Sequence, residues 1–263
     1  MRLFGARPGL LAAVFVAFYP EFIWYCAHFW CETLFLTILW WGLERALAAD
    51  ASGRIRDAAG AGLLFGFAIL TRETFLYLVP VVALWLWFRP SRDRALPLAL
   101  VLTTFAVVAP WTARNAIQFG AFIPVSTGGG LNLYQGNAEV PRDQVYLEYY
   151  VNEGKVEQFE WARMAGLRAI WKRQPGWIFE KIRDEGPRLA ELDSLALIHL
   201  RRGAYESVSC TAYRAVAAVV LLPWLLVAFG AVVGLARVRL DRAALLLIPV
   251  SYTHLTLPTI YSV

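Results

Sequence analysis

The chain has 263 residues, of which 59% are apolar, with a mean hydropathy of +0.50 and a formal net charge of +5. Soluble proteins hold about 45 to 50% apolar residues, so this composition excludes an ordinary soluble domain and indicates a membrane protein. The apolar residues form long blocks, and the arginines lie in small clusters between those blocks. This distribution allows a membrane topology to be derived.

Long apolar runs predict the membrane spans. In chain order they cover residues 9–25, 32–48, 58–70, 74–88, 96–113 and 211–236, and a further run begins at residue 243. An α-helix rises about 1.5 Å per residue and the hydrocarbon core is about 30 Å thick, so the runs at 58–70 and 74–88 are each short for a span. They form either one broken helix or a hairpin of two short helices.

Arginine clusters distinguish these two arrangements. The clusters are Arg2 with Arg7, Arg45 with Arg54 and Arg56, Arg89 with Arg92 and Arg94, and Arg237 with Arg239 and Arg242. If every run is a separate span, all the clusters fall on one face, which the positive-inside rule makes cytoplasmic. A single span over 58–88 would divide the clusters between the two faces, so they favour the hairpin.

The sequence therefore predicts an all-α, polytopic helical membrane protein with about six spans and a truncated seventh. Residues 1–113 are expected to form membrane hairpins, and residues 114–210 a mostly helical loop on the outer face. Residues 211–249 are expected to form the C-terminal spans.

Ionisable side chains gather at the predicted outer face. Glu21 and Glu32 flank the turn FIWYCAHFWC, while Arg72 and Glu73 form the tip of the second hairpin, TRET. A carboxylate costs about 2 to 3 kcal/mol at the centre of a membrane helix and less toward the interface. These residues are therefore candidates for function, and the alternative is that they are hydrated at headgroup depth.

A helical pattern follows in the outer loop. Between residues 156 and 171 the main apolar side chains fall within an arc of about 120° at about 100° per residue. They are Val156, Phe159, Leu167, Ile170 and Trp171. This pattern predicts an amphipathic helix that lies on the membrane or on neighbouring spans and ends at Pro175 and Gly176. Further helical patterns cover 177–183 and 189–200, and the alternative is a capping domain that only packs.

The segment STGGGLNLYQGN, residues 126–137, raises the question of a phosphate site because it holds consecutive glycines. It contains neither GxxxxGK with Ser or Thr nor GxGxxG between a strand and a helix, so it matches neither nucleotide-binding pattern. Its glycines can still bring the backbone close to a ligand or a helix end. We predict an ordered outer loop in which Asn132 and Asn137 hydrogen-bond hydroxyl groups.

Several segments resemble one family. PWTARNAIQFGAFIPVSTGGGLNLYQGN, residues 110–137, is similar to the link between a span and the outer loop in bacterial polyprenyl-phosphate-dependent glycosyltransferases of the GT-C superfamily, relatives of protein O-mannosyltransferases and lipid A aminoarabinose transferases. Three other segments resemble the family's hairpin, its glycine-bearing span and its outer-loop helix: FVAFYPEFIWYCAHFWCETLFL, GLLFGFAILTRETFLYLVP and WARMAGLRAIWKRQPGWIFEKI. Glu73 stands where proline is commoner in the family.

This resemblance implies a multi-pass transferase of the bacterial inner membrane with its long loop in the periplasm. It would move a sugar from a polyprenyl-phosphate carrier to a lipid, glycan or protein acceptor, with membrane lipids and no nucleic acid as further partners. Arg72 and Arg114 are the candidates for the phosphate, because guanidinium groups pair bidentately with it. Glu32 is the candidate for a polar or metal-assisting role, and the remaining substrate-binding candidates are Glu73, Asn115, Asn132 and Asn137. Arg114 has an alternative role as an interfacial anchor after Trp111.

The general base in the family is an aspartate in the first outer loop, which we expect upstream of Met1, so no catalytic residue is assigned. A divalent metal stays open as a cofactor, although no His or Cys cluster in the sequence has metal-ligand spacing. VSYTHLTLPTIYSV, residues 250–263, resembles the translation of a transposon adapter used in sequencing libraries. We therefore expect an internal fragment, inactive alone, with a non-native tail.

Other functional classes stay open from the sequence. A surface-polysaccharide polymerase or ligase would use the same carrier lipid. A transporter or flippase for lipid-linked substrates would share the hydropathy, but it should have discontinuous spans in both halves. A non-catalytic membrane scaffold would explain the hydropathy without the ordered series of motifs at the outer face.

Overall fold

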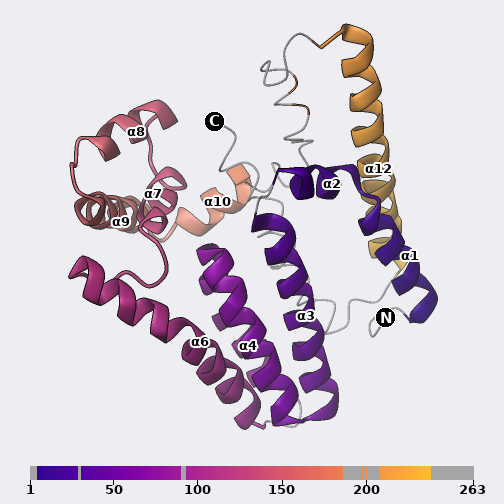
Figure 1. The fold of residues 1–263 in the computed structure, drawn as a ribbon, viewed down its shortest axis with the longest axis horizontal. Helices are drawn as coiled ribbons and strands as arrows, with labels where there is room; N and C mark the ends of the chain where they lie inside the picture. Colours follow the sequence, from indigo (N-terminus) through magenta and orange to yellow (C-terminus); the bar gives the residue numbers. More distant parts are fainter. Residues whose placement is uncertain are drawn as a thin grey trace. The chain divides into compact units, whose positions relative to one another are not determined.

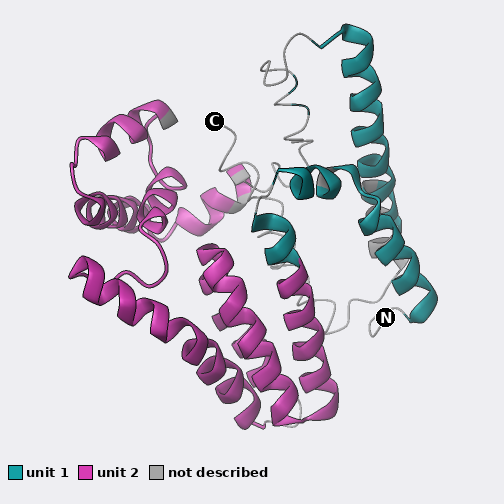
Figure 2. Cartoon of the chain, viewed as in Figure 1, with its two compact units in different colours: residues 1–36, 189–263 teal, residues 37–188 magenta. Residues whose placement is uncertain are grey.

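The computed structural model describes residues 5–28, 31–89, 93–185, 197, 200 and 208–237. Every regular element within these residues is a helix, which confirms the all-α prediction for them (Figure 1). The chain divides into two compact units (Figure 2). Unit 1 comprises residues 1–36 and 189–263, and unit 2 comprises residues 37–188.

Unit 1 contains short apolar helices and one long helix. Its elements are α1 (Ala6–Ala17), α2 (Pro20–Ala27), the start of α3 (Cys31–Ser52) and α12 (Cys210–Arg237). The run 9–25, expected as one span, is divided between α1 and α2. Tyr19 is extended, with ψ of 122°, because the proline that follows it disfavours the helical conformation. α2 then packs against both α1 and α12.

Two described helices are long and apolar enough to cross a membrane. They are α6 (Ala95–Phe119) and the segment Cys210–Val227 of α12, which match the runs predicted at 96–113 and 211–236. The other predicted spans stay predictions. The run from residue 243 and the tail 250–263 lie outside the described residues, as do the helix expected at 189–200, apart from residues 197 and 200, and the side chain of Glu21.

Unit 2 contains two groups of helices. The first consists of most of α3, α4 (Ile55–Thr71), the 3₁₀ helix η1 (Glu73–Tyr77), α5 (Val79–Trp87) and α6. The second group, residues 126–185, holds α7 (Gly128–Gln135), α8 (Arg142–Tyr150), α9 (Lys155–Lys172) and α10 (Trp177–Glu185). We name it the outer module after the outer-face location expected from the sequence, which stays a prediction. The helices predicted from residues 156 and 177 are thus confirmed as α9 and α10. That α9 lies on the membrane or on neighbouring spans stays a prediction.

The two short runs at 58–70 and 74–88 are separate helices, as predicted. α4 ends at Thr71, the next residue Arg72 is extended with φ of −148° and ψ of 104°, and η1 and α5 follow. α4 and α5 both pack against α6. Whether each of them crosses the membrane stays a prediction.

α4 and α6 pack at backbone distance because small residues face the contact. A Cβ atom placed on Gly62 would lie 2.2 Å from the carbonyl oxygen of Leu100, and one on Gly66 would lie 2.5 Å from Cβ of Val107. Thr104 Oγ1 donates to the carbonyl oxygen of Gly62 at 3.1 Å. Such small-residue contacts are typical of membrane helix pairs. They fix the direction in which α4 presents the TRET turn at its C-terminal end.

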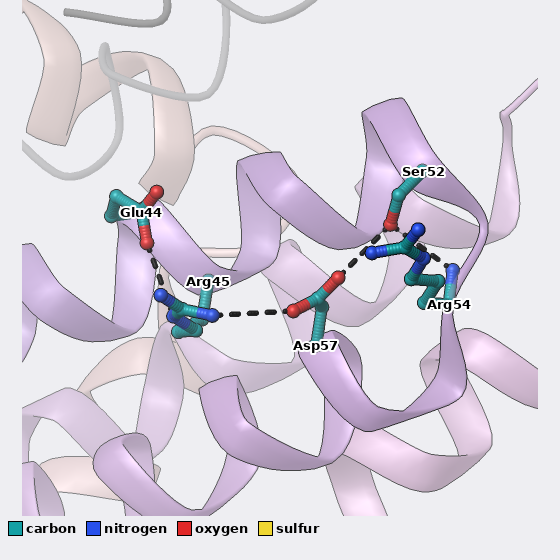
Figure 3. A network of polar contacts seen from close by, with 5 residues as sticks. All are labelled: Glu44, Arg45, Ser52, Arg54 and Asp57. Atoms are coloured by element: carbon teal, nitrogen blue, oxygen red, sulfur yellow. Dashed lines mark hydrogen bonds and ion pairs between the residues drawn. The ribbon is translucent and has the colours of Figure 1, made fainter.

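A polar network joins the C-terminal part of α3 to the first turn of α4, at the end of α4 opposite the TRET turn (Figure 3). Asp57 Oδ1 lies 3.3 Å from Nη1 of Arg45, and Asp57 Oδ2 accepts from the hydroxyl of Ser52 at 3.0 Å. Arg89, which follows α5, donates to the carbonyl oxygen of Asp50 at 2.5 Å. Arginines of two predicted clusters, Arg45 and Arg89, therefore lie at the same end of the first helical group, as the hairpin requires.

We expect Asp57→Ala to lower the stability of this end by about 1 kcal/mol, because the first turn of α4 loses a carboxylate that the helix dipole favours and Ser52 loses its acceptor. The measurement is the midpoint of thermal unfolding in detergent. Glu139→Ala is the control, since the Glu139–Lys172 pair is exposed, with N–O at 3.6 Å. Equal midpoints for the two variants would contradict the role of Asp57.

Candidate functional site

The TRET turn is anchored by its backbone and by an aromatic pair. The amide of Arg72 donates to the carbonyl oxygen of Ala68 at 2.8 Å, and the amide of Phe75 donates to the carbonyl oxygen of Arg72 at 3.1 Å. The ring of Phe75 is buried against that of Phe65, with centroids 5.0 Å apart. Arg72 itself is only 8% exposed. The two charged residues of the turn, Arg72 and Glu73, are therefore held on an ordered backbone.

The Glu73 carboxylate contacts the glycine-rich segment of the outer module. Its Oε2 accepts from the hydroxyl of Ser126 at 2.7 Å, and its Oε1 accepts from the side-chain amide of Asn132 at 3.4 Å. Burial raises the pKa of Glu73 above its ordinary value, while the hydrogen bonds from Ser126 and Asn132 act in the opposite direction. Two sequence candidates, Glu73 and Asn132, are thereby brought into direct contact.

The three glycines of this segment form the first turn of α7, whereas the sequence predicted an ordered loop. Ser126 Oγ accepts from the amide of Gly128 at 3.1 Å, which satisfies one of the free donors at the helix start. A Cβ atom on Gly129 would lie 3.2 Å from both carboxylate oxygens of Glu73. The sequence raised the question whether these glycines approach a phosphate. In the structure the group that approaches them is the carboxylate of Glu73.

Glycine also sets the distance between α7 and α9. A Cβ atom on Gly130 would lie 2.5 Å from the carbonyl oxygen of Phe159, and one on Gly166 would lie 2.9 Å from Cγ of Leu133. The two helices thus meet with glycine on both sides. This packing explains why a glycine-rich sequence with low intrinsic helix propensity is helical here.

Asn115 fastens the segment that leads from α6 into the outer module. α6 ends at Gly120, which is left-handed with φ of 65°, and the chain then reverses alongside the last turns of α6. The Asn115 side-chain amide donates to the carbonyl oxygens of Ile123 at 3.1 Å and Val125 at 2.9 Å. Trp111 Nε1 also donates to Val125, at 2.8 Å. Asn115 is 2% exposed, so its amide is used by the backbone of its own chain.

Arg114 lies beside this fastening and is exposed. Its guanidinium stacks over the ring of Trp111 at 5.0 Å, and Nη1 donates to Oδ1 of Asn115 at 3.0 Å. Both of the roles expected from the sequence, phosphate partner and interfacial anchor, are compatible with this position.

Asn137 joins the end of α7 to α10. Its Oδ1 accepts from Nε1 of Trp177 at 2.8 Å, and its Nδ2 donates to the carbonyl oxygen of Leu133 at 2.8 Å. Its own carbonyl oxygen accepts from Nη2 of Arg173 at 2.7 Å. With 6% exposure, Asn137 lies inside the outer module, at the other end of α7 from Glu73.

One polar contact of the outer module was not predicted from the sequence. The hydroxyl of Tyr134 donates to Oε2 of Glu148 at 2.5 Å, and Gln144 Nε2 donates to the other oxygen at 2.9 Å. Burial, followed by this bond to Glu148, raises the pKa of Tyr134 to about 12. α8, which carries Glu148, was not predicted, because its tyrosine-rich sequence has no clear apolar period.

Glu32 lies in unit 1, in the first turn of α3, where Sγ of Cys31 is 3.9 Å from its Oε2. It stays a candidate on sequence grounds alone. Among the described residues there is no group of three or more His, Cys, Asp and Glu side chains that could hold a metal ion. The role for a divalent metal therefore also stays a prediction.

Comparison with protein families gives a match to part of the chain. Residues 1–113 match the family model described as dolichyl-phosphate-mannose-protein mannosyltransferase. At the level of significance required, no curated protein and no solved structure matches the chain. The matched segment includes Arg72 and Glu73, and the partners of Glu73 at residues 126 and 132 lie beyond it. The first 113 residues of the chain are thus similar to a mannosyltransferase family, in line with the resemblance drawn from the sequence.

Proposed function

We propose that this chain is part of a membrane glycosyltransferase that moves a sugar from a polyprenyl-phosphate carrier to an acceptor at the outer face of the bacterial inner membrane. The observation that carries the proposal is the buried guanidinium-bearing turn at Arg72, which lies inside the segment similar to mannosyltransferases. A guanidinium group pairs bidentately with phosphate, and the ordered backbone of the turn fixes the position from which Arg72 can do so.

The reaction has a simple balance. An acceptor hydroxyl oxygen bonds to the anomeric carbon of the sugar, the bond from that carbon to the phosphate oxygen breaks, and the hydroxyl proton passes to a general base. The polyprenyl phosphate leaves with the electron pair of the broken bond. In this scheme Arg72 and Arg114 stabilise the charge on the leaving phosphate. Glu73 is not given the role of base, because Ser126 and Asn132 already donate to its oxygens.

A polymerase or ligase of surface polysaccharide remains the alternative, because it would take the same carrier. A transporter is less well supported. It should show broken spans in both halves of the chain, and α12 runs without interruption from Cys210 to Arg237 although it contains Pro223.

The test is sugar transfer by the full-length protein in membrane vesicles, with labelled polyprenyl-phosphate sugars as donors. We expect Arg72→Ala to lower transfer by about 100-fold, as the loss of one donor to developing charge does in other enzymes, and Arg114→Ala to lower it less, because Arg114 is exposed. Arg168→Ala on the exposed face of α9 is the control and should be unchanged.

The outcomes separate the parts of this proposal. Unchanged transfer in both variants would remove the two phosphate assignments. No transfer by the unaltered protein from any polyprenyl-phosphate sugar, with transport of such a lipid across the vesicle membrane instead, would refute the enzymatic function.

A further inference from the structure

We infer that Glu73 is a positioning residue whose carboxylate holds the start of α7 against the TRET turn and so fixes the outer module relative to Arg72. The contact itself stands on geometry within unit 2. Its consequence for sugar transfer rests on the proposed function.

The first step is the distance in sequence that the contact spans. Ser126 and Asn132 lie 53 and 59 residues after Glu73, and both direct a donor at its carboxylate. The turn that carries Glu73 lies between α4 and α5 in the first helical group, and its two partners lie at the start of the outer module. The carboxylate therefore joins two parts of unit 2 that the chain connects only through α5, α6 and the reversal after Gly120.

The second step is chemical fit. The start of a helix presents free amide donors and a partial positive charge, which a carboxylate satisfies. α7 begins with Gly128, Gly129 and Gly130, and the Ser126 hydroxyl links the first of these amides to the acid, because it accepts from Gly128 and donates to Oε2 of Glu73. A Cβ atom on Gly129 would lie 3.2 Å from both carboxylate oxygens, closer than nearly all such contacts in proteins. The glycine at this position and the acid at residue 73 therefore suit each other.

The third step links the contact to Arg72. Because Arg72 and Glu73 are consecutive, a constraint on one backbone position restricts the other. Asn115 and Trp111 bind the backbone of residues 123–125, and this positions the next residue, Ser126, beside the turn. Loss of the carboxylate would remove its bonds to Ser126 and Asn132 and leave the segment 120–125, which Asn115 and Trp111 hold on α6, to position the start of α7. Small displacements of positioning groups cost about 100-fold in rate.

Hydrogen–deuterium exchange of the full-length protein tests the contact directly. We expect Glu73→Ala to raise exchange of the amides at 128–131 by about tenfold, because the bonds from Ser126 and Asn132 to the carboxylate hold this helix start, and one hydrogen bond to a charged group contributes on the order of that factor. Glu73→Gln keeps one acceptor oxygen and should give an intermediate rise, and Ser126→Ala should act on the same amides. Glu160→Ala, an exposed acid on α9, is the matched control and should leave them unchanged.

Sugar transfer by the same variants tests the positioning role. Glu73→Ala should lower kcat and change KM by less than about threefold, since a residue that acts through its neighbour alters the rate more than the binding, and Glu73→Gln should restore part of kcat. Exchange at 128–131 like that of the unaltered protein in Glu73→Ala would overturn the contact. Raised exchange with unchanged kcat would overturn the positioning role. Raised exchange in Glu73→Ala, together with no sugar transfer by the unaltered protein, would support the contact and refute the proposed function.

Discussion

Gly62→Ala is expected to lower the thermal unfolding midpoint of the protein, whereas Gly60→Ala, two residues earlier on α4, is expected to leave it unchanged or to raise it. Both substitutions replace glycine by a better helix former, which favours the helix by about 1 kcal/mol. The difference between them therefore comes from the space around the added methyl group.

The space at the two glycines differs sharply. A Cβ atom on Gly62 would lie 2.0 Å from Oγ1 of Thr103 and 2.2 Å from the backbone oxygen of Leu100. The threonine can rotate, but the backbone of α6 must move, and such overpacking costs about 1 to 3 kcal/mol or more. On Gly60 the nearest atom is Cδ of Arg45 at 3.8 Å, which is an ordinary contact.

The midpoints of the two variants, measured in one detergent by the loss of monodisperse protein on heating, provide the comparison. Thr104, which donates to the carbonyl oxygen of Gly62, should lose that bond when α6 moves, so the exchange of α6 amides should rise in Gly62→Ala only. A midpoint of Gly62→Ala at or above that of Gly60→Ala would contradict the close α4–α6 contact.

Local patterns of the sequence predicted the helices that have a clear apolar period or that arginine clusters delimit. The apolar arc predicted α9, and the arginine clusters predicted the break between α4 and α5. The extended Arg72 and the contact of Arg89 with Asp50 agree with that break. A period does not say which part of an apolar arc packs. Phe159 is 5% exposed, and its carbonyl oxygen lies against Gly130 of α7, whereas Trp171, in the same predicted arc, is 81% exposed.

The glycine-rich segment was misread because its conformation depends on residues far away. In isolation, consecutive glycines favour a loop, since each loses backbone entropy in a helix. Here Gly130 and Gly166 allow α7 and α9 to approach, and Glu73 accepts at the start of α7, so tertiary contacts outweigh the propensity. Nothing in the sequence near residue 126 indicates that its partner lies 53 residues earlier.

The role of Asn115 was similarly hidden. The resemblance implied that Asn115 binds substrate, and the structure places its amide on two backbone carbonyls that reach it because the chain reverses after Gly120. A glycine directly after a long helical pattern often ends the helix in the left-handed conformation, and Gly120 is such a signal for the reversal. The acceptors themselves are backbone groups, which no residue pattern identifies.

Asn115→Asp is expected to lower stability by at least about 2 kcal/mol, because it keeps the shape of the side chain and removes its donors. A carboxylate oxygen would then face the carbonyl oxygens of Ile123 and Val125 at the distances of the present bonds, 3.1 and 2.9 Å. Val125 keeps its bond from Trp111, whereas the bond from Asn115 to Ile123 is lost. Arg114, whose Nη1 lies 3.0 Å from Oδ1 of Asn115, offsets part of the new charge. We therefore expect residues 121–126 to unfold locally in Asn115→Asp before the whole protein unfolds.

Exchange at residues 121–126 and the thermal midpoint measure this effect together. Asn152→Asp is the control, since its amide makes one long bond of 3.4 Å to the carbonyl oxygen of Glu148. Because Ser126 follows the fastened segment directly, Asn115→Asp should also raise exchange at the start of α7, as Glu73→Ala does. If Asn115→Asp disturbs 121–126 but leaves the start of α7 protected, the carboxylate of Glu73 holds α7 without the help of α6, and the two fastenings act independently.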